Sequence, residues 1–150
     1  MKRILIATDG SPASLQAVEL GLELAEEHTA QVTFVHVAPA AEVLPLASFP
    51  MAGPVSVPHQ VDEDDRAALD EALARAEQRG IPALTRLLVG NAAKKIVAYA
   101  DEIDADVIVI GSRGLGAVGR TVLGSVSSTV LRDAKRPVLV VREVPAIVAA

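Results

Sequence analysis

The chain has 150 residues, a formal net charge of −5 and no cysteine. That length fits one domain, and the lack of cysteine excludes disulfides and thiolate metal sites. An acidic balance without a block of lysine or arginine argues against nucleic acid as the main partner, and no apolar run reaches the ~18 residues that span a membrane. We therefore expect a cytoplasmic protein that binds neither nucleic acid nor membrane.

Five apolar runs are predicted to form β-strands, at residues 3–8, 31–37, 83–89, 106–110 and 137–141. The segments 107–110 and 138–141 contain only valine, isoleucine and leucine, which is typical of strands buried on both faces. The run 83–89 contains Thr85 and Arg86, which favours an edge of the sheet. Because 51% of the residues are apolar and only 2% are aromatic, the core must be mainly aliphatic.

Four helices are predicted between these strands. The first begins after Ser11, a capping residue that is followed by proline at the first helical position. The second begins near residues 61–64, where acidic side chains complement the positive end of the helix dipole, and ends at Gly80. The third begins at about Asn91, and the fourth covers about residues 124–135.

The alternation of strands and helices predicts an α/β fold with parallel strands and right-handed crossovers, in a single domain over residues 1–150. Residues 38–60 interrupt it with five prolines and no clear period, so we expect a long loop that is either a functional lid or a mobile connection. Residues 143–150 form an apolar tail. An exposed strand edge invites pairing, so the edge at 137–141 and this tail predict a homodimer.

A glycine-rich stretch follows the fourth expected strand. Gly111, Gly114 and Gly124-Ser125 are spaced G-x2-G-x9-G-S. Glycine lets backbone N–H groups approach a ligand closely, and converging N–H groups bind anions. Ser125 opens the last predicted helix, whose N-terminal N–H groups could face the same anion. The stretch therefore predicts a phosphate-binding site.

Two other motifs overlap this stretch. Residues 114–119 match G-x-G-x-x-G, and Glu143 imitates the ribose-binding acid of a dinucleotide site. However, these glycines begin three residues after the strand has ended at Gly111. Residues 114–121 also fall one residue short of a P-loop, because Arg120 replaces the lysine that contacts the β- and γ-phosphates. Both motifs lack their required context.

The glycine–serine spacing belongs to a longer pattern. Its other parts are ILIATDGS at 4–11, His36-Val37, Gly90-Asn91, ADVIVIGSRG at 105–114, LGSV at 123–126 and RPVLVV at 136–141. Over residues 2–142 the chain resembles the universal stress protein family, in its ATP-binding subclass. The resemblance implies an open five-stranded parallel sheet in the order 3-2-1-4-5, Rossmann-like and similar to the adenine nucleotide alpha hydrolases. ATP would lie at the carboxyl ends of the strands, where strand order switches direction.

The resemblance also implies a set of nucleotide-binding residues. Ribose and phosphates would be held by Gly111, Gly114, Gly124 and Ser125. The adenosine portion would be bordered by Ala7, Asp9 and Val37, and Thr8 also belongs to the binding set. The glycines would be flanked by Ile110 and Val126, with Arg113 and Ser127 as further neighbours.

Two residue types leave alternatives open. Asp9 stands in an Asp-Gly turn, so its carboxylate either caps the backbone of that turn or contacts a ribose hydroxyl or a divalent cation. His28, His36 and His59 show no metal-ligand spacing, and His36, within an apolar strand, is expected to be buried with hydrogen-bond partners. The sequence does not determine whether Mg²⁺ or Mn²⁺ accompanies ATP, and Asp9 is the candidate ligand if one does.

No activated nucleophile or acid–base pair is visible, so hydrolysis of ATP is expected to be slow at most. The leading hypothesis is an ATP-binding regulatory stress-response protein whose nucleotide-dependent conformation is recognised by an unknown protein partner. One alternative is a slow ATPase that uses Mg²⁺ or Mn²⁺. Another is a protein–protein interaction module that binds AMP or no nucleotide.

Overall fold

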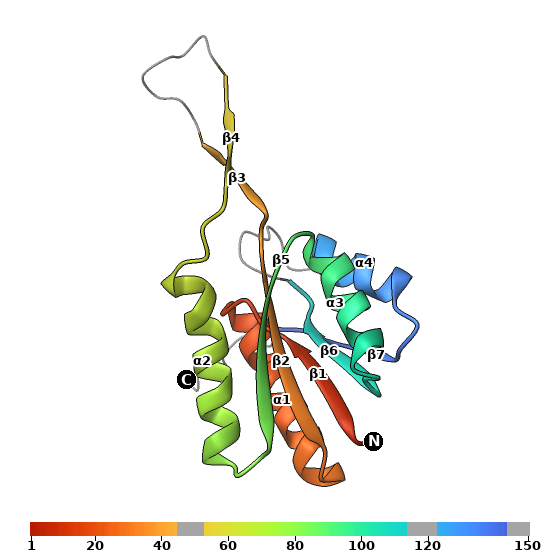
Figure 1. Cartoon of the computed structure of the whole chain (residues 1–150). Coiled ribbons are helices and arrows are strands. Elements are labelled where there is room, and N and C mark those ends of the chain that lie inside the picture. Colours follow the sequence, from red (N-terminus) through yellow and green to blue (C-terminus); the bar gives the residue numbers. More distant parts are fainter. Residues whose placement is uncertain (45–52, 114–122, 144–150) are drawn as a thin grey trace, which may run out of the picture.

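The computed structural model describes residues 1–44, 53–113 and 123–143, and its main body is a parallel β-sheet between two layers of helices (Figure 1). The sheet has five strands in the order β5-β2-β1-β6-β7. Their bounds are Arg3–Ala7 (β1), Gln31–Ala38 (β2), Ala83–Val89 (β5), Val107–Gly111 (β6) and Val138–Val141 (β7). Numbered by their succession along the chain, these strands have the predicted order 3-2-1-4-5.

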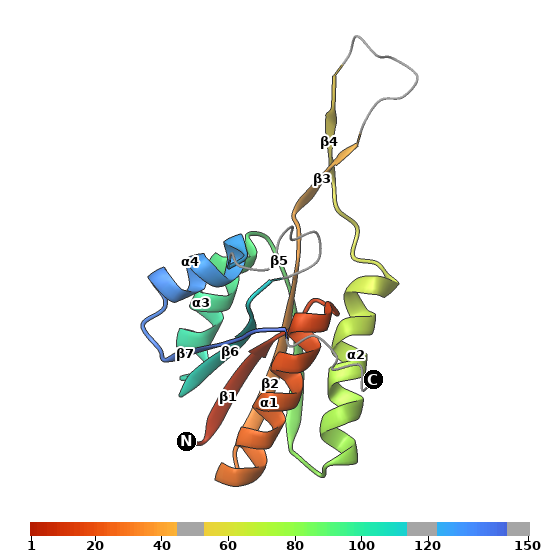
Figure 2. The same cartoon turned by 180° about the vertical axis from the view of Figure 1, so that it is seen from behind.

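Two helices cover each face of this sheet, and Figures 1 and 2 show the two layers from opposite sides. One layer contains α1 (Pro12–His28) and α2 (Glu63–Gln78), and the other contains α3 (Ala92–Glu102) and α4 (Ser125–Asp133). Alternate residues of β1 point to the two layers: Ile4 and Ile6 pack with α1 and α2, and Leu5 packs with α3 and α4. The helices on both faces confirm the predicted fold class.

Aliphatic side chains form nearly all of both cores. Phe34 on β2 is the aromatic residue of the core and is fully buried. Tyr99 on α3 is only partly buried, and the guanidinium of Arg86 lies 5.8 Å from the centre of its ring. Branched aliphatic residues suit a sheet that is covered on both sides.

The helices begin at residues whose side chains or backbone suit a helix N-terminus. The Ser11 side chain accepts a hydrogen bond from the N–H of Ser14, and Pro12 follows it, as predicted for α1. Asp62 and Asp65 form a reciprocal capping box at α2. Asn91 caps α3 through the N–H of Lys94. These contacts satisfy N–H groups that have no partner within the helix.

A two-stranded antiparallel ribbon joins β2 to α2 and projects beyond the carboxyl ends of the main sheet (Figure 1). We call β3 (Ala41–Leu44) and β4 (Val55–Pro58) the ribbon. The segment 38–60 was expected to be a loop without regular structure, and the ribbon corrects this. Each strand has only four residues, which is too short for its alternation to stand out among prolines.

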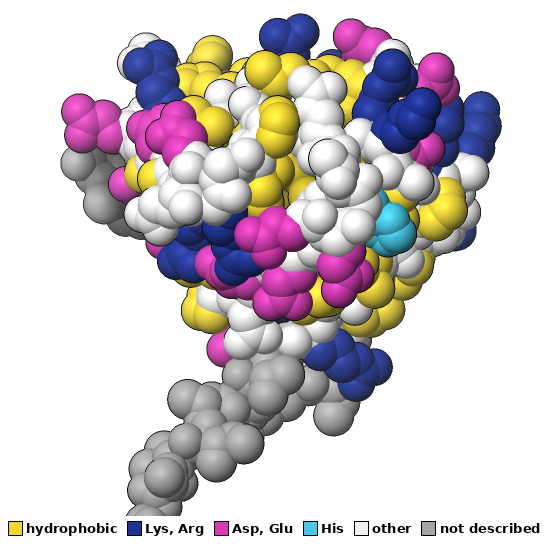
Figure 3. All heavy atoms as spheres, turned by 90° about the horizontal axis from the view of Figure 1, so that it is seen from below, with side chains coloured by type: hydrophobic (Ala, Val, Ile, Leu, Met, Phe, Trp, Pro, Cys, Tyr) yellow, Lys and Arg dark blue, Asp and Glu magenta, His cyan; other side chains and the backbone are white. Residues whose placement is uncertain are grey.

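The opposite end of the molecule contains the amino ends of the main strands. Basic and acidic side chains lie next to one another on this face (Figure 3). Arg136, for example, contacts Asp101 at 3.1 Å and Asp104 at 2.9 Å. Across the described residues, no helix has both the length and the apolar character needed to cross a membrane.

The capping box at α2 predicts a measurable loss of stability. Replacing Asp62 by alanine removes the acceptor for the N–H of Asp65, so the free energy of unfolding should fall by about 1 kcal/mol. Asp64→Ala, in the exposed first turn of the same helix, should cost only about 0.3 kcal/mol because it removes a charge near the helix dipole and no cap. Urea denaturation measures both variants, and equal losses would contradict the assigned cap.

Candidate functional site

The candidate site lies at the carboxyl ends of β1 and β6, which are neighbours at the centre of the sheet. Ile6 is paired with Val109, so Ala7 and Ile110 end the two strands at the same edge. From β1 the chain turns towards β2, whereas after β6 it continues to β7 on the other side. This is the switch point at which open α/β sheets form a ligand-binding crevice.

The turn after β1 is held together by its own side chains. Asp9 Oδ1 accepts a hydrogen bond from the N–H of Ser11 at 2.9 Å, and Gly10 has the positive φ of 79° that this turn requires. The buried hydroxyls of Thr8 and Ser14 lie 3.3 Å apart. Asp9 therefore has the role in the turn that its sequence context suggested. A ligand role for the same carboxylate is a separate proposal.

Gly111 permits the close approach of α1 to the end of β6. A Cβ atom at this position would lie 2.8 Å from the carbonyl carbon of Ala13 and 2.9 Å from the backbone nitrogen of Ser14. Both are backbone atoms, so neither can move aside as a flexible side chain would. Packing alone therefore requires glycine at position 111, whether or not a ligand is bound.

The carbonyl of Ser112 attaches α4 to the same strand end. It accepts hydrogen bonds from the N–H of Gly124 at 2.7 Å and from the hydroxyl of Ser127 at 2.8 Å. The Ser127 hydroxyl also contacts the carbonyl of Gly124 at 3.0 Å and is buried. Ser127, a predicted site residue, thus has structural hydrogen bonds of its own.

The N-terminus of α4 differs from those of the other described helices. Gly124 occupies the cap position in an extended conformation and supplies no side-chain hydrogen bond, whereas α1, α2 and α3 are each capped by a side chain. Ser125 is exposed and Val126 is partly buried. The first turn of α4 therefore has N–H groups that an anion could bind.

The remaining predicted residues lie around this centre. Val37 is partly buried near the end of β2 and packs against the core beneath α3 and α4. Arg113 is partly buried, and its Nη2 lies 4.0 Å from Oε2 of Glu143, the residue considered above as a ribose-binding acid. Gly114 lies outside the described residues, as do both overlapping motifs, at 114–119 and 114–121.

A chain of polar side chains, which sequence reasoning missed, runs from this site to the ribbon. His36 Nδ1 lies 3.0 Å from the carbonyl oxygen of Thr8, and His36 Nε2 lies 3.0 Å from Oδ1 of Asp65. His59 Nε2 lies 2.8 Å from Oδ2 of Asp65, and its Nδ1 contacts Glu42. The four side chains come from β2, α2, the end of β4 and β3, so no sequence spacing relates them.

The hydrogen bonds among these four side chains shift the pKa values of His59 and Asp65. Hydrogen bonds to Asp65, and secondly to Glu42, raise the pKa of His59 above its usual 6.5. Burial alone would raise the pKa of Asp65, but hydrogen bonds from His59 and His36 outweigh it, so this pKa lies well below its usual 3.8. Within the described part of the chain, no group of three or more His, Asp or Glu residues is arranged to hold a metal ion.

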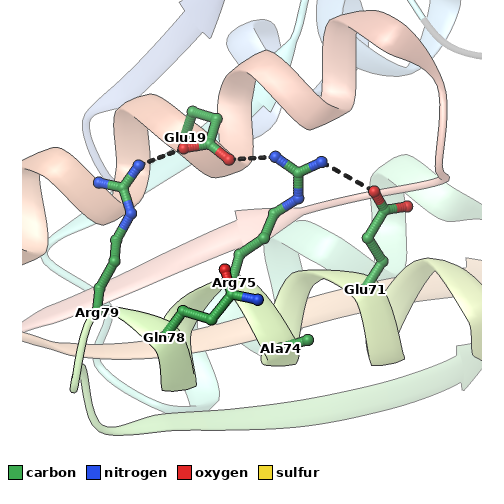
Figure 4. A pocket seen from close by; sticks show the side chains of 6 residues that line it. All are labelled: Glu19, Glu71, Ala74, Arg75, Gln78 and Arg79. Carbon is green, nitrogen blue, oxygen red and sulfur yellow. Dashed lines mark hydrogen bonds and ion pairs between the residues drawn. The ribbon is translucent and has the colours of Figure 1, made fainter.

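A hollow of about 470 Å³ lies between α1 and α2, away from the candidate site (Figure 4). Glu19 on α1 contacts both Arg75 and Arg79, and Arg75 also contacts Glu71 at 2.9 Å. Hydrogen bonds to Glu71 and then Glu19 raise the pKa of Arg75. These charged side chains pair with one another and lie towards the C-terminal end of α2. We therefore interpret the hollow as part of the packing contact between α1 and α2, and not as a ligand site.

The strand order, with its switch point between β1 and β6, places the chain in the class of open α/β folds. The model of the universal stress protein family matches residues 1–142, so the chain belongs to this family. Universal stress protein MJ0531 of Methanocaldococcus jannaschii is 35% identical over 95% of this chain and 82% of its own. Universal stress protein YxiE of Bacillus subtilis is 34% identical over 93% and 98%.

Solved structures show the same fold with nucleotides bound. A universal stress protein in complex with cAMP has a TM-score of 0.68 and 29% identity, covering 95% of this chain and 98% of its own. The universal stress protein from Archaeoglobus fulgidus in complex with dAMP has a TM-score of 0.62 and 26% identity, covering 94% and 98%. Both ligands are adenine nucleotides.

The packing at Gly111 predicts that alanine is not tolerated there without cost. The added methyl group would push α1 away from β6 and lower the free energy of unfolding by about 1–3 kcal/mol. Gly124→Ala serves as a graded comparison, because its Cβ would meet the nearest atom, the Ser112 oxygen, at 3.3 Å. Chemical denaturation should show the larger loss for Gly111→Ala, and the reverse order would contradict the assigned contact.

Proposed function

We propose that this chain binds an adenine nucleotide, ATP in the first instance, at the carboxyl ends of β1 and β6. The observation that carries the proposal is the N-terminus of α4, which has no side-chain cap and is attached to the end of β6 through Ser112. A helix N-terminus attracts phosphate through its free N–H groups and its dipole. The related structures with cAMP and dAMP support an adenine nucleotide as the ligand.

Within this proposal, each predicted residue is assigned a role. The backbone N–H groups of Ser125 and Val126 would bind phosphate. Gly124, whose own N–H bonds to Ser112, would let the phosphate approach the helix closely, as would Gly114. The half-buried Val37 would border the adenine, because it stands near the end of the neighbouring strand β2. Ala7, Thr8, Ile110 and Gly111 would form the floor, and Arg113 and Ser127 would support the phosphate side.

A divalent cation would bind with the phosphates of ATP. Asp9 is the candidate ligand, since its carboxylate stands in the turn that directly follows β1. Mg²⁺ accepts one or two carboxylate ligands together with phosphate oxygens. The described residues of the site place no general base beside a nucleophile, so the expected rate of hydrolysis is low, and the role of the nucleotide is regulatory.

Regulation would work through two conformational states of different nucleotide affinity, one of which a partner protein recognises. A ligand can shift such an equilibrium only through its different affinity for the two states. Because α4 is held to β6 through Ser112 and Gly124, phosphate binding at its first turn acts directly on this joint. Nucleotide binding is therefore expected to change the position of α4 relative to the sheet.

Calorimetric titration of the nucleotide-stripped chain tests the ligand. ATP should bind with micromolar or tighter affinity, and ADP and AMP, each with and without Mg²⁺, show which phosphates contribute. If Asp9→Ala removes only the Mg²⁺-dependent part of the affinity, the carboxylate is a metal ligand. The absence of binding by every adenine nucleotide would overturn the proposal and favour an interaction module.

Substitution of two glycines tests the place of binding. Gly114→Val combined with Gly124→Val should abolish ATP binding, because the added side chains occupy the phosphate position, while circular dichroism should show an unchanged fold. Ala98→Val, at an exposed position of α3 away from the strand ends, is the control for added side-chain volume and should bind ATP as wild type does. Unchanged ATP affinity in the double variant would place the nucleotide elsewhere.

The edge strand β7 carries the prediction of a homodimer. Its four residues are only partly buried. The carbonyls of Pro137 and Val141 accept hydrogen bonds from the N–H groups of Ile108 and Ser112. Because alternate residues of a strand bond to opposite sides, the N–H groups of Val138 and Val140 face outwards. Light scattering at micromolar concentration should give a dimer mass. Val140→Pro, which removes an outward N–H group, should shift the mass towards the monomer. A wild-type monomer would refute the dimer.

A further inference from the structure

The ribbon is attached to the body of the molecule by a cluster of ionisable side chains around His59. His59 directly follows β4, and its side chain is only 7% exposed. It lies between Asp65, in the first turn of α2, and Glu42 on β3. The N–H of His59 also bonds to the carbonyl of Ala40 at 3.1 Å and thereby closes the base of the ribbon. His59 is thus in contact with both ribbon strands and with the body.

Both ring nitrogens of His59 face oxygen atoms that can only accept. Nε2 lies 2.8 Å from the Asp65 carboxylate, and Nδ1 contacts the Glu42 carboxylate. A neutral imidazole has a single N–H and can donate to one partner only, whereas an imidazolium donates to both. The geometry therefore fits a protonated His59. Loss of that proton would leave one of the two carboxylates facing a nitrogen lone pair.

The Asp65 carboxylate is held in place from the other side. Its Oδ1 faces His36 on β2 at 3.0 Å, and its Oδ2 also accepts the N–H of Asp62 at 3.1 Å in the capping box. Its side chain is 10% exposed, while that of Glu42 is 46% exposed. The titratable groups around His59 are therefore Glu42 from β3, Asp65 and Asp62 from the start of α2, and His36 from β2.

We propose that His59 is a proton-dependent attachment of the ribbon: its protonated ring joins Glu42 to Asp65, and its deprotonation releases the ribbon from α2. An isolated two-stranded ribbon is at best marginally stable in water, so this one depends on contacts with the body. Val43 and Val55 on the ribbon are 68% and 40% exposed, so packing by these two valines contributes little to that attachment. This inference does not depend on a bound nucleotide.

The direction of the pH dependence follows from the pKa of His59. Because docking raises this pKa, its contribution is fully present below the usual value of 6.5 and is lost as the pH rises through the raised value. The lowered pKa of Asp65 sets the acid limit, since protonation of Asp65 removes the acceptor on α2. The ribbon should therefore be docked in mildly acidic solution and released as the pH rises through the raised pKa of His59.

Two measurements on the full chain test this attachment. NMR titration of the histidine rings gives the pKa of His59, and hydrogen exchange gives protection factors for the amides of residues 41–44 and 55–57. Protection should fall as the pH rises from the usual histidine pKa of 6.5 to the measured pKa of His59, by about tenfold for each pKa unit that docking adds. Protection that is constant through this pH range, or absent at every pH, would overturn the proposal.

Three variants identify the groups responsible. In His59→Gln, ribbon protection should be low and independent of pH, because glutamine cannot carry the charge. Glu42→Gln should lower the His59 pKa and move the upper end of the pH range of release by the same amount, while the exposed position of Glu42 leaves the fold intact. His28→Gln, an exposed histidine at the end of α1, is the matched control and should behave as wild type. An unchanged pH range of release in Glu42→Gln would refute the role of the bridge.

Discussion

The contact between Gly111 and the backbone of Ala13 and Ser14 is the constraint on which the centre of this structure depends. It lets the first turn of α1 lie directly against the end of β6. The next residue, Ser112, receives the hydrogen bonds that attach α4 on the other face of the sheet. Two consecutive residues, the last of β6 and the one that follows it, therefore position the N-termini of two helices, one in each layer.

The two helix N-termini at this edge differ in how their N–H groups are satisfied. The N-terminus of α1 is occupied by its own Ser11 cap, so it is structurally complete. The N-terminus of α4 begins at glycine and lacks such a cap, which leaves its N–H groups for a ligand. This difference in capping, and not a particular catalytic side chain, distinguishes the two N-termini at this edge of the sheet.

The main strands could be predicted because continuous valine and isoleucine runs, such as that of β6, are typical of strands covered on both faces. Their order was implied by the family resemblance. The ribbon could not be predicted, since its two strands have four residues each and lie among prolines. The attachment of His59 was invisible for another reason: its partners on β3 and α2 meet only in the folded chain. Gly111 was predicted as a ligand-binding glycine, and the structure adds a packing requirement that no motif could express.

The scarcity of aromatic residues has a practical consequence. The chain has no tryptophan, and Tyr99, its single tyrosine, lies beside Arg86 near the surface. Such a protein absorbs very weakly in the near ultraviolet, whereas an adenine ring absorbs strongly there. The absorbance spectrum of the purified protein is therefore dominated by any co-purifying adenine. Occupancy can be read directly from the intact sample, without denaturing it or separating the ligand.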